Sequence, residues 1–426
     1  MKNTNMKNTK ERMKFAAAAV AVLLFLTGCL ETIKPQTPDD GYIINQLTVE
    51  EMQEDIDRLV EDIDKKHINP YTNITAEEFS AAAAEISAKL PDLTSEQFFF
   101  EMRRLTALIG DSHTGVNTST ARSENLSVLP FVAESFSDGW YITSADLTCS
   151  GIVGAKLEAI NGKTPEQLTE ILAPYIPHDN EAWLEGSVVN IVNMTDYLED
   201  AGVVTDGTAE LTVNLDGEKQ SVRLSAVKRG TLNKDSFVSV ERTAPLTALQ
   251  DDNYISIEDG EMLYIQYNLC QESRRKSIKK FTEELTAQLE GKTAVTVDLR
   301  FNSGGNSNVL EPVISLLSGF DGDVYVLVGK DTFSSAILNA VDLKNMAGAV
   351  LVGTPTGGSG NHFGEIKSDV LRNSGILLFY STKYFENYEG EGVDSLMPDV
   401  VAEQSFSDYL DGIDTQYNAV LGLAKG

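Results

Sequence analysis

The pattern of apolar and polar residues divides the chain into three parts after its N-terminal segment. In the first part, apolar residues recur at intervals of three and four, as on one face of a helix, and they include Met52, Ile56, Leu59, Val60 and Ile63. Three Thr-x-x-Glu/Gln capping boxes mark helix starts: Thr48/Glu51, Thr75/Glu78 and Thr94/Gln97. The pattern therefore predicts an N-terminal helical domain over residues 48–118.

Short β-like runs and turn residues follow over residues 119–245. The alternation of "ELTVNLDGEKQSVRLSAV" around Asp216 and Gly217 predicts a β-hairpin. Thr164 followed by Pro165 predicts the start of a helix within this part. We therefore expect a β-rich middle module.

Strand-like runs alternate with helical patterns over residues 246–426. The expected helices lie near residues 272–290, 307–317 and 334–346. The expected strands are "MLYIQYN", "AVTVDLR", "VYVLVG", "AVLVG" and "GILLFY". Such alternation predicts an α/β layer with parallel strand pairs, in which functional residues usually follow the strands.

The N-terminal segment has the pattern of a signal peptide over residues 1–28. Basic residues precede the apolar run Phe15–Leu26, which is shorter than the roughly 20 residues that a membrane-spanning helix needs. The sequence "LTGC" at its end resembles the bacterial lipoprotein box, in which the cysteine, here Cys29, is lipidated. The alternative is an ordinary secretory signal. We expect an exported protein, lipid-anchored to the bacterial cell membrane in the cell envelope, with a polar linker over residues 29–47.

The charge of the chain limits its partners. It has 64 acidic and 34 basic residues, a formal net charge of -30, which disfavours nucleic acids and anionic lipid surfaces. The histidines are scattered and no HExxH motif occurs, so we expect no metal site and no cofactor. Cys149 and Cys270 lack a CxxC context and are too few for a disulfide framework.

Candidate chemistry begins with Ser334 and Ser335, which lie where a strand-like run gives way to a helical pattern. A serine at such a junction could be a nucleophile, because the free N–H groups of a helix start stabilise negative charge. Either serine could instead be a helix N-cap, which the local pattern alone favours. The local pattern leaves both interpretations open.

A serine nucleophile needs a base, and the chain has four histidines: His67, His113, His178 and His362. His113 lies in "GDSHTG", a glycine-flanked turn that could present an imidazole. His362, in "GGSGNHFGE", is the main alternative. Gly304 and Gly305, in "DLRFNSGGN", could supply N–H groups to an oxyanion.

Four of these motifs together carry a resemblance to a family. "GDSHTG", "DLRFNSGG", "TFSSA" and "LVGTPTGG", in this order, resemble the serine peptidases of the C-terminal processing and tricorn core group. The resemblance extends from about Thr48 to the C-terminus. It implies a crotonase-like α/β catalytic domain over residues 246–426, an N-terminal helical bundle and a β-rich, PDZ-like middle module.

The resemblance also implies roles for individual residues. Ser334 matches the nucleophile, and the N–H of Ser335 would form the oxyanion hole with Gly304 or Gly305. The lysine base of the processing peptidases would fall near Ser359, where this chain has no lysine.

The match is therefore closer to the tricorn type, in which a histidine is the base. That role falls on His113, with Ser112 as a supporting residue. A glutamate from the C-terminal part would complete the site. Glu386 is favoured over Glu389 and Glu391.

We therefore expect an exported, lipid-anchored serine peptidase that cleaves peptides or protein C-terminal segments through an acyl-enzyme. The alternative is a catalytically silent cell-surface protein that binds peptides with the same fold. An esterase of the α/β-hydrolase type is disfavoured because the chain lacks the GxSxG motif around the nucleophile. The oligomeric state stays open.

Overall fold

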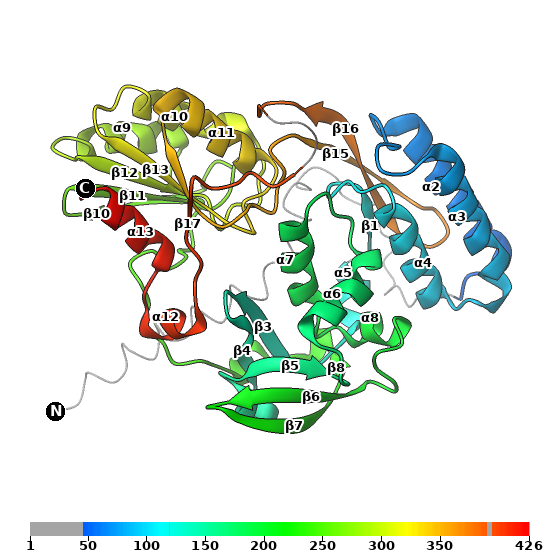
Figure 1. The fold of residues 1–426 in the computed structure, drawn as a ribbon. Coiled ribbons are helices and arrows are strands. Elements are labelled where there is room, and N and C mark those ends of the chain that lie inside the picture. The colour runs from blue at the N-terminus through cyan, green and yellow to red at the C-terminus, as the bar shows by residue number, and fades with distance from the viewer. Residues whose placement is uncertain (1–45, 119, 390–393, 426) are drawn as a thin grey trace.

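The computed structural model describes residues 46–118, 120–389 and 394–425 (Figure 1). The expected signal peptide, the lipidated Cys29 and most of the 29–47 linker lie outside these residues, as does Glu391. Within the described residues, no helix is both long enough and apolar enough to cross a membrane.

The N-terminal part forms the helices that its capping boxes predicted. They are α2 (Val49–Lys66), α3 (Ala76–Lys89) and α4 (Ser95–Ala107). In each, the Thr side chain accepts the backbone N–H three residues on, and the Glu or Gln side chain accepts the N–H of the Thr. The predicted apolar face of α2 is buried, with Leu59 and Ile63 fully inaccessible to solvent.

A small antiparallel sheet pairs a strand that follows the N-terminal helices with two strands from the C-terminal part of the chain. It has the order β1-β16-β15, and its strands are β1 (Gly115–Asn117), β16 (Leu377–Phe385) and β15 (His362–Val370). In Figure 1, β15 and β16 (orange) lie beside the blue N-terminal helices and apart from the larger α/β sheet.

The strand "GILLFY" was predicted in the α/β layer, and this prediction is wrong. Its hairpin docks on α2 instead, because the buried carboxylate of Asp55 accepts the backbone N–H groups of Asn373 (3.2 Å) and Ser374 (2.8 Å) in the hairpin turn. The N–H of Ile68 also donates to the carbonyl of Ser381 on β16, at 3.0 Å.

The middle part combines an antiparallel sheet with helices. The sheet has the order β3-β4-β5-β6-β7, with β9 beside β4, and β2 and β8 form a separate pair. The predicted hairpin is β6–β7, and its turn residues Asp216 and Gly217 both have positive φ. The helix predicted at Thr164 is α6, with a complete capping box.

The strands are β2 (Ser127–Val128), β3 (Phe131–Phe136), β4 (Gly139–Asp146), β5 (Lys156–Ile160), β6 (Thr208–Leu215), β7 (Glu218–Ser225), β8 (Val227–Lys228) and β9 (Phe237–Ser239). The helices are α5 (Thr120–Asn125), α6 (Pro165–Leu172), α7 (Glu181–Ile191) and α8 (Thr195–Asp200).

The C-terminal part contains the predicted α/β layer. Its sheet has the order β10-β11-β12-β13-β14-β17, with β10 antiparallel to β11 and the other neighbours parallel. The strands are β10 (Tyr254–Asp259), β11 (Met262–Tyr267), β12 (Ala294–Asp298), β13 (Asp323–Val328), β14 (Val350–Gly353) and β17 (Val400–Val401). The helices are α9 (Ile278–Gln288), α10 (Glu311–Leu317), α11 (Ser335–Ala347), α12 (Phe406–Asp411) and α13 (Thr415–Leu423).

Alternate residues of these strands enter different cores. Val295 and Val297 pack in the core with α9, α10 and α11, whereas Ala294 on the same strand packs in the core with α13. Both faces of the sheet are thus covered, which explains the continuous apolar runs of its strands. The mixed α/β class with several sheets is confirmed.

One continuous core joins the N-terminal helices, the middle part and the β15–β16 hairpin. It contains Leu59 from α2, Ile142 from β4, Leu198 from α8 and Leu378 from β16. The "GDSHTG" turn follows α4 and leads into β1, so it lies where these parts meet.

Candidate active site

Ser334 lies between β13 and α11 in a conformation that few residues adopt. Its φ is 54° and its ψ is -124°, and its side chain makes no capping hydrogen bond to the helix. Ser334 occupies the N-cap position of α11 but does not cap the helix with a side-chain hydrogen bond. Strained backbone of this kind costs about 1–3 kcal/mol and concentrates at functional sites.

This strain gives a testable stability difference. We expect Ser334→Gly to have a free energy of unfolding about 1 kcal/mol higher than Ser334→Ala, because glycine adopts positive φ without a Cβ clash. Urea unfolding of both variants measures the difference. Equal stability would show that the turn is not strained at this residue.

Two glycines lie in close backbone contacts near Ser334, Gly304 against the Ser334 turn and Gly305 against Cys270. Gly304 has φ of +107°, and a Cβ on it would lie 2.8 Å from the Cβ of Ser334 and 3.1 Å from the N of Ser335. Gly305 has φ of +130°, and a Cβ there would lie 2.4 Å from the carbonyl oxygen of Cys270. Neither position has room for a side chain, so this close approach requires glycine.

The N–H groups of this region differ in their partners. The Gly304 N–H donates to Asn302 Oδ1 at 2.9 Å. The N–H groups of Gly305 and Ser335 have no acceptor among the described residues. The hydroxyl of Ser335 donates to the carbonyl of Gly305 at 2.7 Å and holds the two segments together. Of the two glycines, Gly305 thus has the N–H that is available to a ligand.

His113 lies beside the nucleophile turn in a row of stacked rings. The centroid distances are 4.2 Å for Trp183–Phe333, 4.4 Å for Phe333–His113, 5.5 Å for His113–His362 and 5.3 Å for His362–Phe385. Phe333 directly precedes Ser334. The structure thus brings together Ser334, Ser335, Gly304 and Gly305, and it places His113 against the adjoining residue.

The two ring nitrogens of His113 differ in their surroundings. Nδ1 lies 3.5 Å from Ser112 Oγ, whereas Nε2 is buried and has no hydrogen-bond partner. Burial and, to a smaller extent, His362 lower the pKa of His113 to about 3, against the opposing effect of the Asp111 charge. The ring is therefore neutral near pH 7. With its proton on Nδ1, it presents a bare Nε2 that can accept a proton.

Asp111 fixes the "GDSHTG" turn. Its Oδ1 accepts the backbone N–H of His113 at 2.9 Å, and its Oδ2 accepts from Thr114 Oγ1 (2.5 Å), Ser381 Oγ (2.6 Å) and His67 Nε2 (3.0 Å). Burial raises the pKa of Asp111, but hydrogen bonds from His67, Ser381 and Thr114 and the nearby His113 bring it to about 2. His67 thus supports the turn through Asp111.

His362 and Ser359 lie in the loop where the family resemblance would place a lysine base and where this chain has none. His362 Nδ1 donates to the carbonyl of Ser359 at 2.9 Å, and burial lowers the pKa of His362. Its ring contacts His113 but makes no ring contact with Phe333. His362 thus lies one ring farther along the row from the Ser334 turn. His178, half-buried and bonded to the carbonyl of Ile176, lines a separate groove beside α4.

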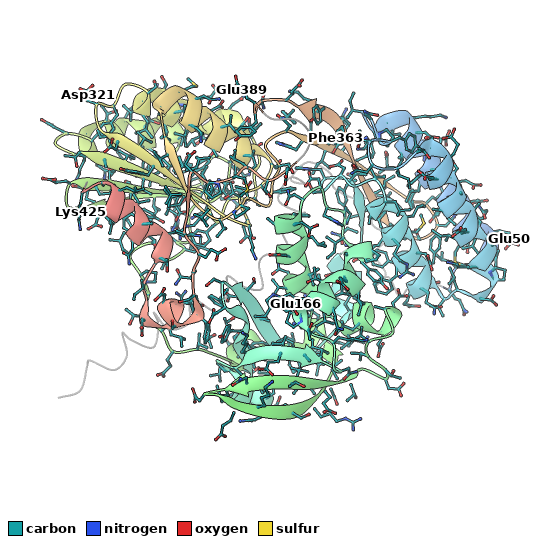
Figure 2. The ribbon with its side chains drawn as sticks, viewed as in Figure 1. Glu50, Glu166, Asp321, Phe363, Glu389 and Lys425 are labelled. Carbon is teal, nitrogen blue, oxygen red and sulfur yellow. The ribbon has the colours of Figure 1, made fainter. Side chains whose placement is uncertain are left out.

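The structure does not bring the favoured glutamates to His113. Glu386 and Glu389 are exposed, and neither hydrogen-bonds to a described residue. Figure 2 shows Glu389 at the outer edge of the molecule, whereas Phe363 on β15 lies near the N-terminal helices.

Sequence reasoning missed Asp179, Asn180 and Trp183. Asn180 is the N-cap of α7, which its position before a helical pattern could have indicated. Nothing local indicates that Asp179 lies against Ser112, because the contact joins segments 67 residues apart.

Comparisons with known proteins identify the fold. No family model and no curated protein sequence matches the chain. The crystal structure of mature CPAF is similar over 88% of this chain and 96% of its own, with 13% identity and a TM-score of 0.63. Mature CPAF complexed with lactacystin covers 88% and 98% at 12% identity and a TM-score of 0.59. The photosystem II D1 C-terminal processing protease covers 88% and 97% at 11% identity and a TM-score of 0.42. The chain therefore has the fold of mature CPAF, and the predicted resemblance to the C-terminal processing and tricorn core group is confirmed at the level of the fold.

Proposed function

We propose that the chain is an exported, lipid-anchored serine peptidase that cleaves peptides or protein C-terminal segments. The observation that carries the proposal is the uncapped, positive-φ Ser334, pressed against the Gly304–Gly305 turn, with the unpartnered Nε2 of His113 in the ring stacked on the preceding residue. The fold shared with mature CPAF agrees with it.

In the first half of the reaction, Ser334 Oγ attacks the carbonyl carbon of the scissile bond while His113 Nε2 takes the hydroxyl proton. The carbonyl oxygen becomes an oxyanion, which the N–H groups of Ser335 and Gly305 stabilise. The C–N bond then breaks, and His113 gives its proton to the leaving amine.

In the second half, water attacks the acyl-ester carbon and gives a proton to His113. The ester C–O bond breaks, and the proton returns to Ser334 Oγ. Each proton that His113 accepts it also returns, so the enzyme is restored. Neither half uses a metal or a cofactor.

The finer assignments belong to the same proposal. We assign the α/β part to the crotonase-like class and the middle module to the PDZ-like class. The "LTGC" sequence supports lipidation of Cys29, which incorporation of labelled palmitate into the full chain, and its absence in Cys29→Ser, would test.

The test is labelling by a fluorophosphonate probe, followed by mass spectrometry of the labelled peptide. A serine activated by a base and an oxyanion hole reacts with such probes, whereas an ordinary serine does not. We expect the adduct on Ser334. A folded protein that binds peptides but never reacts would instead support the silent binding protein.

A further inference from the structure

A hydrogen-bond chain runs from His113 into the middle part of the molecule. His113 Nδ1 lies 3.5 Å from Ser112 Oγ, and the Ser112 hydroxyl donates to Asp179 Oδ2 at 3.1 Å. Ser112 and His113 are both buried, with exposed fractions of 7% and 3%. Because the hydroxyl proton goes to Asp179, a lone pair of Ser112 Oγ is free to accept the Nδ1–H of His113.

Asp179 is held in place by its neighbour in sequence. Asn180 Nδ2 donates to Asp179 Oδ1 (3.2 Å), to Ser359 Oγ (2.9 Å) and to the carbonyl of Gly357 (2.8 Å). Asn180 Oδ1 accepts the N–H of Trp183 as the N-cap of α7. The carboxylate thus lies directly before the N-cap of α7, and this N-cap is hydrogen-bonded to the loop carrying His362.

We propose that Asp179 is the positioning carboxylate of this site: it orients Ser112, which holds the proton of His113 on Nδ1 and leaves Nε2 as the base. The inference rests on the proposed function. It assigns to the middle part of the chain a role that the family resemblance assigns to a C-terminal glutamate.

The other carboxylates of the region fit this role less well. Asp111 Oδ1 lies 3.9 Å from His113 Nδ1 but accepts the backbone N–H of His113, and Oδ2 is shared among His67, Thr114 and Ser381. Glu386 is exposed and hydrogen-bonds to no described residue.

Titration of Asp179 should make kcat depend on pH, an effect that Asp179 would not have if its role were only structural. Burial and, to a smaller extent, the charge of Asp111 raise the pKa of Asp179 to about 7, against the opposing effect of hydrogen bonds from Ser112 and Ser359. Asp111 is the titratable group that faces Asp179, and His113 lies beyond Ser112. Ionised Asp179 stabilises the His113 imidazolium that forms during attack, so kcat should rise as the pH passes through about 7.

The experiment measures kcat and KM of Asp179→Asn against pH with a peptide substrate. We expect kcat at pH 8 to fall about 10²-fold, the scale of general-base catalysis, with KM nearly unchanged. The rise near pH 7 should disappear. Glu181→Gln is the matched control, because it removes an exposed carboxylate two residues away at the same helix start, and it should behave as wild type.

Ser112→Ala removes the hydroxyl that links Asp179 to His113, so it interrupts the same hydrogen-bond chain. It keeps the proposal testable if Asp179→Asn fails to fold. It should also lose the rise near pH 7, and the double variant should lose little more than either single variant. A wild-type pH profile in both single variants would overturn the proposal, as would a loss in Glu386→Gln with Asp179→Asn unaffected. These outcomes are separate from failure of the proposed function, in which wild-type protein itself neither labels nor cleaves.

Discussion

Ser334→Ala is expected to lower kcat for peptide cleavage by about 10⁵-fold, because removing the nucleophile of a serine peptidase leaves only binding and oxyanion stabilisation. Alanine keeps the Cβ, so the contacts with Gly304 and the start of α11 stay in place. Turnover of a fluorogenic peptide, with fluorophosphonate labelling in parallel, measures the effect.

The control for this variant is Ser318→Ala, an exposed serine at the end of α10 that bonds only to a nearby carbonyl. It should keep full activity. Retained cleavage in Ser334→Ala would exclude Ser334 as the nucleophile. Peptide binding that persists in a protein without any cleavage would favour the silent binding protein.

His113→Gln is expected to lower kcat by about 10⁴-fold, near the upper end of what a positioned base contributes. Glutamine fills much of the ring's space but cannot accept the proton of Ser334. Since burial lowers the pKa of His113 to about 3, the wild-type base stays unprotonated throughout the neutral range. The variant also lacks the ring through which Asp179 acts, so the rise in kcat near pH 7 should be absent and the loss should be larger at pH 8 than at pH 6.

The comparison variant is His362→Gln, which tests the rival base directly. Because the ring of His362 stacks on His113 and not on Phe333, the residue before Ser334, its replacement should lower kcat much less than that of His113. His178→Gln, in a separate groove, should have no effect. A larger loss in His362→Gln than in His113→Gln would reverse the assignment of the base. Circular dichroism and thermal unfolding establish that each variant is folded.

The elements that sequence predicted are those set by local chemistry. The capping boxes at Thr48, Thr75 and Thr94 and the turn at Asp216 act over a few residues, and the structure contains all of them. The apolar run at "GILLFY" fits any buried strand equally well. Its place beside α2 depends on Asp55, more than 300 residues away in the chain. No local pattern contains that information.

The same distinction applies to the site. Ser334, His113 and the two glycines could be named because each lies in a short motif with its own chemistry. Asp179 could not, since a single acidic residue before a helix is common in a chain this acidic. The row of rings from Trp183 to Phe385 likewise gathers residues from five separate segments.

The contact between the "GDSHTG" turn and β16 also makes the candidate site depend on the C-terminal part of the chain. Ser381 lies on the hairpin that completes the sheet around β1, and its hydroxyl is one of the groups that fix Asp111 beneath His113. The chain is synthesised from its N-terminus, so His113 emerges long before Ser334 and Ser381. A nascent or partly unfolded chain therefore lacks the assembled site, and the proposed catalysis requires that the last third of the chain has docked.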